Sequence, residues 1–279
     1  MADGLSSQSS GTFARDDDPQ LVKDATPFAL KTMEGIADQL DDHLGLRVAM
    51  ASGFTQYSYA FVQEDADEIA DKEPDRATGL RNRALRLYLR ARDYGFAGLR
   101  IAHKIEPAQL RGTDDERSRA LAQIKKEEVP LLYWTLVPWA AAISLDKRNL
   151  ELVGDVPVIA AMLDRATALD PDYARGALDE FSLAFDSARP GGTTPAAQKQ
   201  HFEHAAALQK GVKISALVSY AENVLGPAQD KPGFEKLLHE ALAFDTDKMD
   251  ARDFRLANLI AQRRARFLLA HESDLINSD

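Results

Sequence analysis

Two of the six histidines of this chain stand three residues apart, and histidine is a common metal ligand and general base. On a helix, His201 and His204 would share one face. That spacing fits one edge of a metal site, but no HExxH or ExxH pattern and no third ligand at a supporting distance accompanies it. We therefore interpret the pair as an ordinary polar helix face, and we predict neither a metal nor another cofactor.

Nucleophile chemistry finds no support in the sequence. The absence of cysteine excludes thiolate nucleophiles, disulfides and cysteine-ligated zinc. No GxSxG elbow, GxxxxGK[ST] phosphate loop or GxGxxG turn is present. The acidic run of residues 16–18 lacks the alternating oxygen ligands of a calcium loop, so it is interpreted as a helix cap. We expect no enzyme and no catalytic residue, with an all-α enzyme lacking a known motif as a remaining alternative.

Both tryptophans lie in one apolar block, residues 129–157, with Pro138 between Trp134 and Trp139. If the block is helical, Pro138 cannot donate to the carbonyl of Trp134, so the helix is expected to bend or stop there. A bend beside bulky aromatic side chains opens a pocket for an apolar ligand, or it serves core packing. The block alone does not decide between the two.

A second aromatic group has helical spacing. Phe54, Tyr57 and Phe61 fall at i, i+3 and i+7 and so share one helix face. In the last apolar segment, Asn258 and Gln262 are four residues apart and, if buried, need partners from helix ends or from a polar head group. The predicted ligand-binding residues are Phe54, Tyr57, Phe61, Tyr133, Trp134, Trp139 and Phe181 as walls and Asn258 as a polar anchor.

Helical periodicity runs through almost the whole chain. Three pairs, Asp18-Pro19, Asp170-Pro171 and Thr194-Pro195, place a capping residue before a proline, which is typical of a helix start. The pattern predicts helices at residues 19–42, 46–71, 75–103, 114–128, 130–147, 156–169, 172–187, 195–209, 213–225, 231–244 and 252–271.

A weak internal repeat organises the second half of the chain. Ala166, Ala205 and Ala241 are 39 and 36 residues apart, each three residues after a large apolar side chain and shortly before a helix end. This resembles the second helix of a tetratricopeptide (TPR) motif, in which the alanine lets neighbouring helices approach closely. The pattern predicts an all-α fold of TPR-like stacked helical hairpins.

Length and composition bound the remaining possibilities. The 279 residues, 45% of them hydrophobic, are enough for a large core, and we expect a flexible leader at residues 1–18 followed by a single domain at 19–279. A formal charge of −10 without a basic stripe argues against nucleic acid as a partner. Charges interrupt the apolar block before it reaches the roughly 20 residues of a membrane span, so no membrane-crossing helix is expected. The N-terminus has no signal-peptide pattern.

Several segments together resemble the TatT family, the TPR-like T-component associated with TRAP transporters. They are residues 131–181 (LLYWTLVPWAAAISLDKRNLELVGDVPVIAAMLDRATALDPDYARGALDEF), DATPFALKTMEG from residue 24, ASGFTQYSYAFVQEDAD from residue 51, RALRLYLRARDYG from residue 83, HFEHAAAL from residue 201 and RLANLIAQRRARFLLA from residue 255. The resemblance implies an all-α fold with a central hydrophobic cavity or pore. It also implies export to the periplasm, usually on a lipid anchor, and cooperation with a periplasmic substrate-binding protein. The chain departs from the family in having no lipobox cysteine and in carrying Pro138.

These observations predict a periplasmic protein that binds a lipid, fatty acid or sterol-like ligand and exchanges it with its partner carrier. The alternative is a TPR-like protein–protein scaffold with no small-molecule ligand. Peripheral membrane attachment through an N-terminal lipid absent from this chain and homo-oligomer formation are both left open, as is the identity of the ligand.

Overall fold

The computed structural model describes residues 11–189 and 192–276, and within them the chain forms helices and turns but no strand. This confirms the predicted all-α fold class. The chain divides into two compact units. The first unit is Gln20–Pro171, and the second comprises the described residues of Ser10–Pro19 and of Asp172–Asp279.

The described part of the first unit contains helices α2 to α10, with one π-helix and one 3-10 helix among them. In chain order the elements are α2 (Pro19–Ala37), α3 (Leu44–Ser58), the π-helix η1 (Tyr59–Gln63), α4 (Glu64–Ile69), α5 (Pro74–His103), α6 (Pro107–Arg111), α7 (Asp114–Ala122), the 3-10 helix η2 (Lys126–Glu128), α8 (Val129–Leu145), α9 (Leu150–Val153) and α10 (Val156–Leu169).

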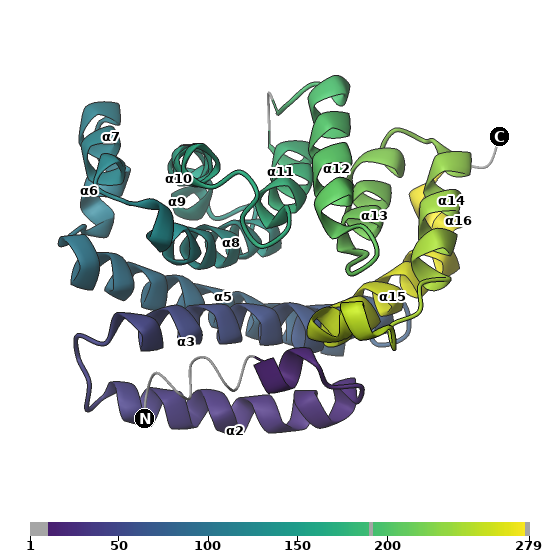
Figure 1. Cartoon of the computed structure of the whole chain (residues 1–279), viewed down its shortest axis with the longest axis horizontal. Coiled ribbons are helices and arrows are strands. Elements are labelled where there is room, and N and C mark those ends of the chain that lie inside the picture. The colour runs from purple at the N-terminus through teal and green to yellow at the C-terminus, as the bar shows by residue number, and fades with distance from the viewer. Residues whose placement is uncertain (1–10, 190–191, 277–279) are drawn as a thin grey trace. The chain divides into compact units, whose positions relative to one another are not determined.

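Helices α3, α5 and α8 pack against one another at the centre of this unit (Figure 1). Two glycines of α5 allow α8 to approach closely. A Cβ atom at Gly95 would lie 2.3 Å from Thr135 Oγ1, and one at Gly98 would lie 2.6 Å from Leu131 Cδ1. At Gly95 the added Cβ would also lie 3.0 Å from the Thr135 Cα, so a larger side chain there would push α8 away, whereas at Gly98 it would first displace the end of the Leu131 side chain.

Helix α8 continues through Pro138 to Leu145 instead of stopping at the proline. The stretch Lys126–Leu145 is long and apolar enough to cross a membrane by length and composition, with a mean hydropathy of 1.2, although the sequence analysis expected no such segment. Packing explains much of this apolarity, because α8 contacts α5, α10 and α3 and 44% of its most apolar window is buried. A central core helix of a globular unit has the same composition.

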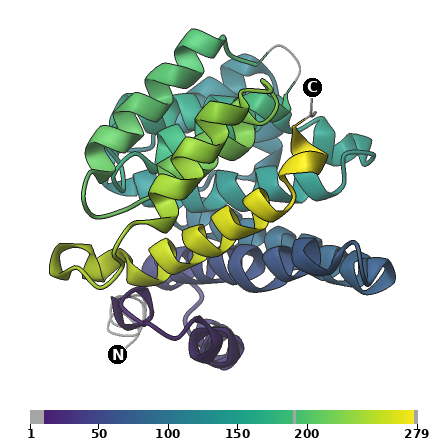
Figure 2. The same ribbon diagram turned by 90° about the vertical axis from the view of Figure 1, so that its right-hand side faces the viewer.

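The second unit contains α11 (Ala177–Ala188), α12 (Pro195–Gln209), α13 (Ser215–Tyr220), the π-helix η3 (Ala221–Leu225), α14 (Lys231–Leu242), the 3-10 helix η4 (Met249–Phe254), α15 (Arg255–Ala270) and α16 (Glu272–Leu275). Helix α11 pairs with α12, the segment α13–η3 pairs with α14, and α15 runs along α14 (Figure 2). The core between the last pairs includes Phe234, Leu238, Ala261 and Leu268.

The three aligned alanines occupy equivalent places. Ala166 in α10, Ala205 in α12 and Ala241 in α14 are each fully buried, and each lies on the later helix of a contacting pair. Ala205 of α12 lies very close to the turn before α11, because a Cβ atom added to Gly176 would lie 2.7 Å from the Cα atom of Ala205. Small residues at these positions therefore permit tight helix pairing, as the repeat predicted.

Two of the three predicted helix starts are confirmed. Helix α2 begins at Pro19, and α12 begins at Pro195, where Thr194 Oγ1 accepts a hydrogen bond from the amide of Ala197 at 3.2 Å. The start at Asp170-Pro171 is wrong. Asp170 ends α10, and the chain then forms a turn before α11 begins at Ala177, because contacts with α12 hold residues 172–176 in another conformation.

The predicted leader falls into two parts. Residues 1–10 lie outside the described residues. Residues 11–14 are helical, and within the second unit Arg15 pairs with Asp253 at 2.6 Å and Asp17 pairs with Arg255 at 3.1 Å. The described part of the predicted leader therefore makes ion pairs with the segment around η4.

Candidate functional site

Helix α8 presents one partly exposed apolar face. The side chains of this face recur every three or four residues, and we refer to them as the α8 stripe: Pro130, Tyr133, Trp134, Val137, Ala140 and Ala141. The opposite side of the helix is buried and includes Leu132, Leu136 and Trp139. Within the stripe, the rings of Tyr133 and Trp134 meet edge to face with centroids 4.9 Å apart. A row of aromatic and small apolar side chains that keeps some exposure is suited to contact with an apolar ligand.

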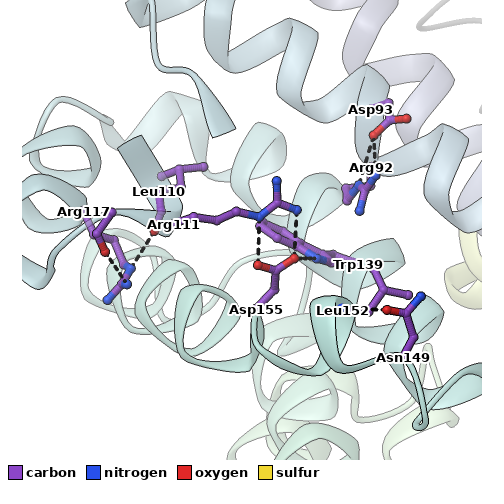
Figure 3. A network of polar contacts seen from close by, with 10 residues as sticks. Arg92, Asp93, Leu110, Arg111, Arg117, Trp139, Asn149, Leu152 and Asp155 are labelled. Carbon is purple, nitrogen blue, oxygen red and sulfur yellow. Dashed lines mark hydrogen bonds and ion pairs between the residues drawn. The ribbon is translucent and has the colours of Figure 1, made fainter. Parts of the chain in front are cut away.

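The two tryptophans therefore have different environments. Trp139 is fully buried and packs edge to face on Phe96, with ring centroids 4.9 Å apart. Its indole Nε1 donates a hydrogen bond to Asp155 Oδ2 at 3.1 Å (Figure 3). Trp139 is thus held by core packing and by one polar contact, whereas Trp134 is partly exposed. The ligand-wall role of Trp139 stays a prediction.

Asp155 joins three parts of the first unit. It is 4% exposed, and it accepts two hydrogen bonds from the Arg111 guanidinium, both at 2.8 Å, in addition to the bond from Trp139 (Figure 3). The Arg111 guanidinium also lies over the Trp139 ring, 5.3 Å from its centre. The hydrogen bonds to Asp155 raise the pKa of Arg111 above its ordinary value. Through these contacts the Asp155 carboxylate ties Arg111 of α6 and the start of α10 to Trp139 of α8.

Neither Asp155 nor Arg111 was predicted from the sequence. Asp155 stands at the start of α10, one residue before Val156-Pro157, and a capping role would be the expectation from that position. Its side chain makes no cap hydrogen bond and is used instead by Arg111 and Trp139. The only sequence signal is an acid beside an apolar block that contains a tryptophan needing an acceptor.

The aromatic trio of α3 and η1 is covered by other side chains. Phe54, Tyr57 and Phe61 are 3%, 7% and 6% exposed. Phe54 stacks on Tyr94 with centroids 5.7 Å apart, and the Tyr94 hydroxyl donates to Glu34 of α2 at 2.5 Å. Burial and this hydrogen bond raise the pKa of Tyr94. Phe61 lies in the π-helix η1, where its ring is 5.9 Å from that of Tyr57, and all three rings are packed within the first unit.

The other two predicted site residues belong to the second unit. Phe181 is partly exposed and stacks on Phe185 with centroids 5.3 Å apart. Asn258 is fully buried, and its side-chain oxygen accepts from the amide of Ile214 at 3.2 Å while its nitrogen donates to the carbonyl of Val212 at 2.9 Å. The predicted need of Asn258 for partners is met by the turn that follows α12.

Two further observations on the described residues concern metal ions and small-molecule pockets. In residues 11–189 and 192–276, no three His, Cys, Asp or Glu side chains are placed to hold a metal ion. A small surface hollow of about 220 Å³ in the second unit is lined by Thr246, Asp247, Met249, Arg252 and Arg255. Its volume is below the range of about 300–1,000 Å³ typical of small-molecule pockets, and its lining is mostly polar.

Comparison with known proteins gives the family. The sequence model of the family described as TRAP transporter T-component matches residues 15–276, which is nearly the whole chain. The chain belongs to this family. The resemblance seen in the sequence is thereby confirmed, and membership implies association with a TRAP transporter and a membrane-associated or periplasmic role.

This T-component is also similar to a protein of Treponema pallidum (strain Nichols). The two are 29% identical over 265 residues, which cover 94% of this chain and 81% of the relative. The relative is described as an uncharacterized protein, so the similarity adds no activity or ligand.

Proposed function

We propose that this T-component is a non-enzymatic periplasmic protein that binds a hydrophobic ligand and exchanges it with a substrate-binding partner of the transporter. The ligand class is a lipid, a fatty acid or a sterol-like molecule. The observation that carries the proposal is the α8 stripe, which keeps Tyr133 and Trp134 partly exposed on an otherwise packed core helix. Transfer of an alkyl chain from water to such a surface is favourable by about 0.8 kcal/mol per buried methylene.

Family membership supports the transport side of the proposal. A transporter-associated component with no visible metal cluster or catalytic motif among its described residues is suited to binding and handing over a molecule. The stripe would supply affinity without strict shape selection, because apolar burial is non-directional. Such a surface suits a carrier that must release its ligand as well as hold it.

A TPR-like scaffold that holds another protein is the second candidate function. It is favoured by Leu21 and Phe28, which lie seven residues apart on one face of α2 and are 57% and 79% exposed. Two large apolar side chains on one exposed helix face are typical of protein contacts. The scaffold hypothesis requires no small-molecule ligand.

The first test examines the purified protein for bound lipid by organic extraction and mass spectrometry, followed by titration with a long-chain fatty acid and with a sterol. The chain has two tryptophans, so Trp139→Phe leaves Trp134 as the reporter and Trp134→Phe leaves Trp139. We expect a saturable fluorescence change with Trp134 as the reporter and a much smaller one with Trp139.

A charge placed in the stripe provides the matched comparison. Val137→Asp puts a carboxylate between Trp134 and Ala141 and should weaken ligand binding at least tenfold. Leu150→Asp adds the same charge at an 82% exposed position of α9, outside the stripe, and should leave binding unchanged. No extractable lipid and no saturable change with either ligand would overturn the proposal and favour the scaffold.

A further inference from the structure

The second unit begins with a turn in an unusual backbone conformation. Ala174, Arg175 and Gly176 follow one another with φ angles of 46°, 59° and 82°, all in the left-handed region. Glycine adopts this region freely, but alanine and arginine do so only when their surroundings hold them there. The turn therefore depends on contacts made by neighbouring elements.

Helix α12 supplies those contacts. His204 Nε2 lies 3.2 Å from Asp172 Oδ1 at the beginning of the turn. The Arg175 guanidinium donates to the carbonyl of Leu208 at 3.1 Å, and Gln209 Nε2 donates to the carbonyl of Arg175 at 3.2 Å. Of these contacts, only the one through His204 involves a group that changes charge near neutral pH.

His204 lies between two carboxylates. Its Nδ1 is 2.7 Å from Asp179 Oδ2 in α11, while its Nε2 faces Asp172. A neutral imidazole carries one N–H and would turn a lone pair toward one of these carboxylates, whereas the charged imidazolium donates to both. Asp179 is 9% exposed, and its other oxygen lies 2.8 Å from His201 Nδ1. His201 and His204 of α12 therefore share this one buried carboxylate of α11.

The other charged groups nearby have their own partners. Glu180, next to Asp179 on α11, pairs with Lys213 at 2.5 Å and accepts from Gln209. Arg175 is held on the carbonyl of Leu208 and over the ring of Phe254, 5.6 Å from its centre. The hydrogen bond with Asp179, followed by the charges of Asp179 and Asp172, raises the pKa of His204, although partial burial opposes the shift.

We propose that His204, Asp172 and Asp179 form a pH-operated latch that holds the turn of residues 172–176 on α12. The charged imidazole bridges the two carboxylates and keeps the turn closed. The neutral imidazole gives up its contact with Asp172, and Ala174 and Arg175 then relax out of the left-handed region. The latch acts at the place where the chain passes from the first unit, which ends at Pro171, into the second.

The direction of the pH dependence follows from the raised pKa. The contribution of the charged form is complete below the ordinary histidine value of about 6.5, and it is lost as the pH rises through the higher value of His204 in the folded protein. The turn is therefore closed below the ordinary histidine value and opens as the pH rises past the higher pKa of His204.

Trypsin provides a direct readout, because Arg175 is exposed and lies inside the turn. A protease needs an extended substrate backbone, which the left-handed turn does not offer. We expect cleavage after Arg175, identified by mass spectrometry and normalised to a short arginine peptide at each pH, to rise at least fivefold from pH 6 to pH 8.5. NMR titration of the histidine ring signals in the full chain should give His204 a pKa above 6.5.

Two variants and a control separate the latch from general loosening. Asp172→Asn should lower the pKa of His204 and raise cleavage at pH 6. His204→Gln should make cleavage independent of pH. His239→Gln changes a histidine on α14 whose Nδ1 bonds the carbonyl of Glu235, away from the turn, and it should behave as the unmodified protein does. Equal normalised cleavage at both pH values, or a His204 pKa at or below 6.5, would overturn the proposal.

Discussion

Removing either partner of the Arg111–Asp155 pair should destabilise the first unit, and removing both should cost about as much as removing Asp155 alone. Arg111→Ala leaves the Asp155 carboxylate, whose side chain is 6% exposed, with only the Trp139 N–H, which we expect to cost about 3–5 kcal/mol. Asp155→Ala leaves the Trp139 N–H buried without an acceptor, at about 1–3 kcal/mol, while the 37% exposed Arg111 side chain turns to water.

In the double variant no buried carboxylate remains, and the main loss is the acceptor of Trp139. Its cost should therefore be close to that of Asp155→Ala, giving a coupling energy between the two positions equal to the cost of Arg111→Ala, about 3–5 kcal/mol. Asp164→Ala removes an exposed acid from the same helix, α10, and should change stability by less than about 0.5 kcal/mol.

Tryptophan fluorescence during urea unfolding measures these changes in the right part of the molecule. Both tryptophans lie in the first unit, so the signal follows that unit and not the second. A double-variant cost equal to the sum of the single costs, within about 0.5 kcal/mol, would refute the argument, because it would mean that Asp155 and Arg111 do not compensate each other's charge.

Three further predictions concern packing, buried amides and the N-terminus. Gly95→Ala should lower the free energy of unfolding in urea by at least about 1 kcal/mol, because the added Cβ would meet Thr135. Gly79→Ala, on the same helix with open space around it, should be neutral or stabilising. Equal effects of the two substitutions would contradict the close approach of α8 to Gly95. Asn258→Ala should cost about 1–3 kcal/mol and speed hydrogen exchange of the Ile214 amide, and unchanged exchange would show that the amide has another acceptor. Removing residues 1–18 deletes the ion pairs Arg15–Asp253 and Asp17–Arg255, each worth about 0–1 kcal/mol, so the thermal midpoint should fall by a few degrees at most, and a larger drop would reveal packing by this segment.

Local sequence signals predicted helix starts correctly at two positions. They failed at a third, where contacts with residues distant in the sequence determine the backbone conformation. Asp18-Pro19 and Thr194-Pro195 start helices because a cap and a proline act within one turn. Asp170-Pro171 has the same local pattern, yet the following residues are held in a turn by His204 and Gln209, more than thirty residues away. Tertiary contacts of this kind leave no local trace.

The sequence predicted that the candidate site lies in the apolar block of residues 129–157. It did not predict which side chains of that block are buried and which are partly exposed. Helix α8 is hydrophobic on nearly all sides, so periodicity could not show that Trp139 faces the core while Trp134 stays partly exposed. Asp155, which accepts the hydrogen bond of the buried Trp139, is 16 residues from it in the sequence. Arg111, the ion-pair partner of Asp155, is 44 residues from Asp155. Asn258 was correctly expected to need a partner, but its spacing could not name Val212 and Ile214.

The two amides of α15 also affect the order in which the second unit matures. Asn258 closes the turn after α12, about 45 residues earlier in the chain, and Gln262 donates to the carbonyls of Ala241 and Phe244 at the end of α14. During synthesis these backbone groups emerge well before α15 does, and they stay hydrated until it docks. A chain that stalls before Arg255 would hold α12 and α14 with unfinished ends, a form that quality-control proteases recognise more readily than the completed unit.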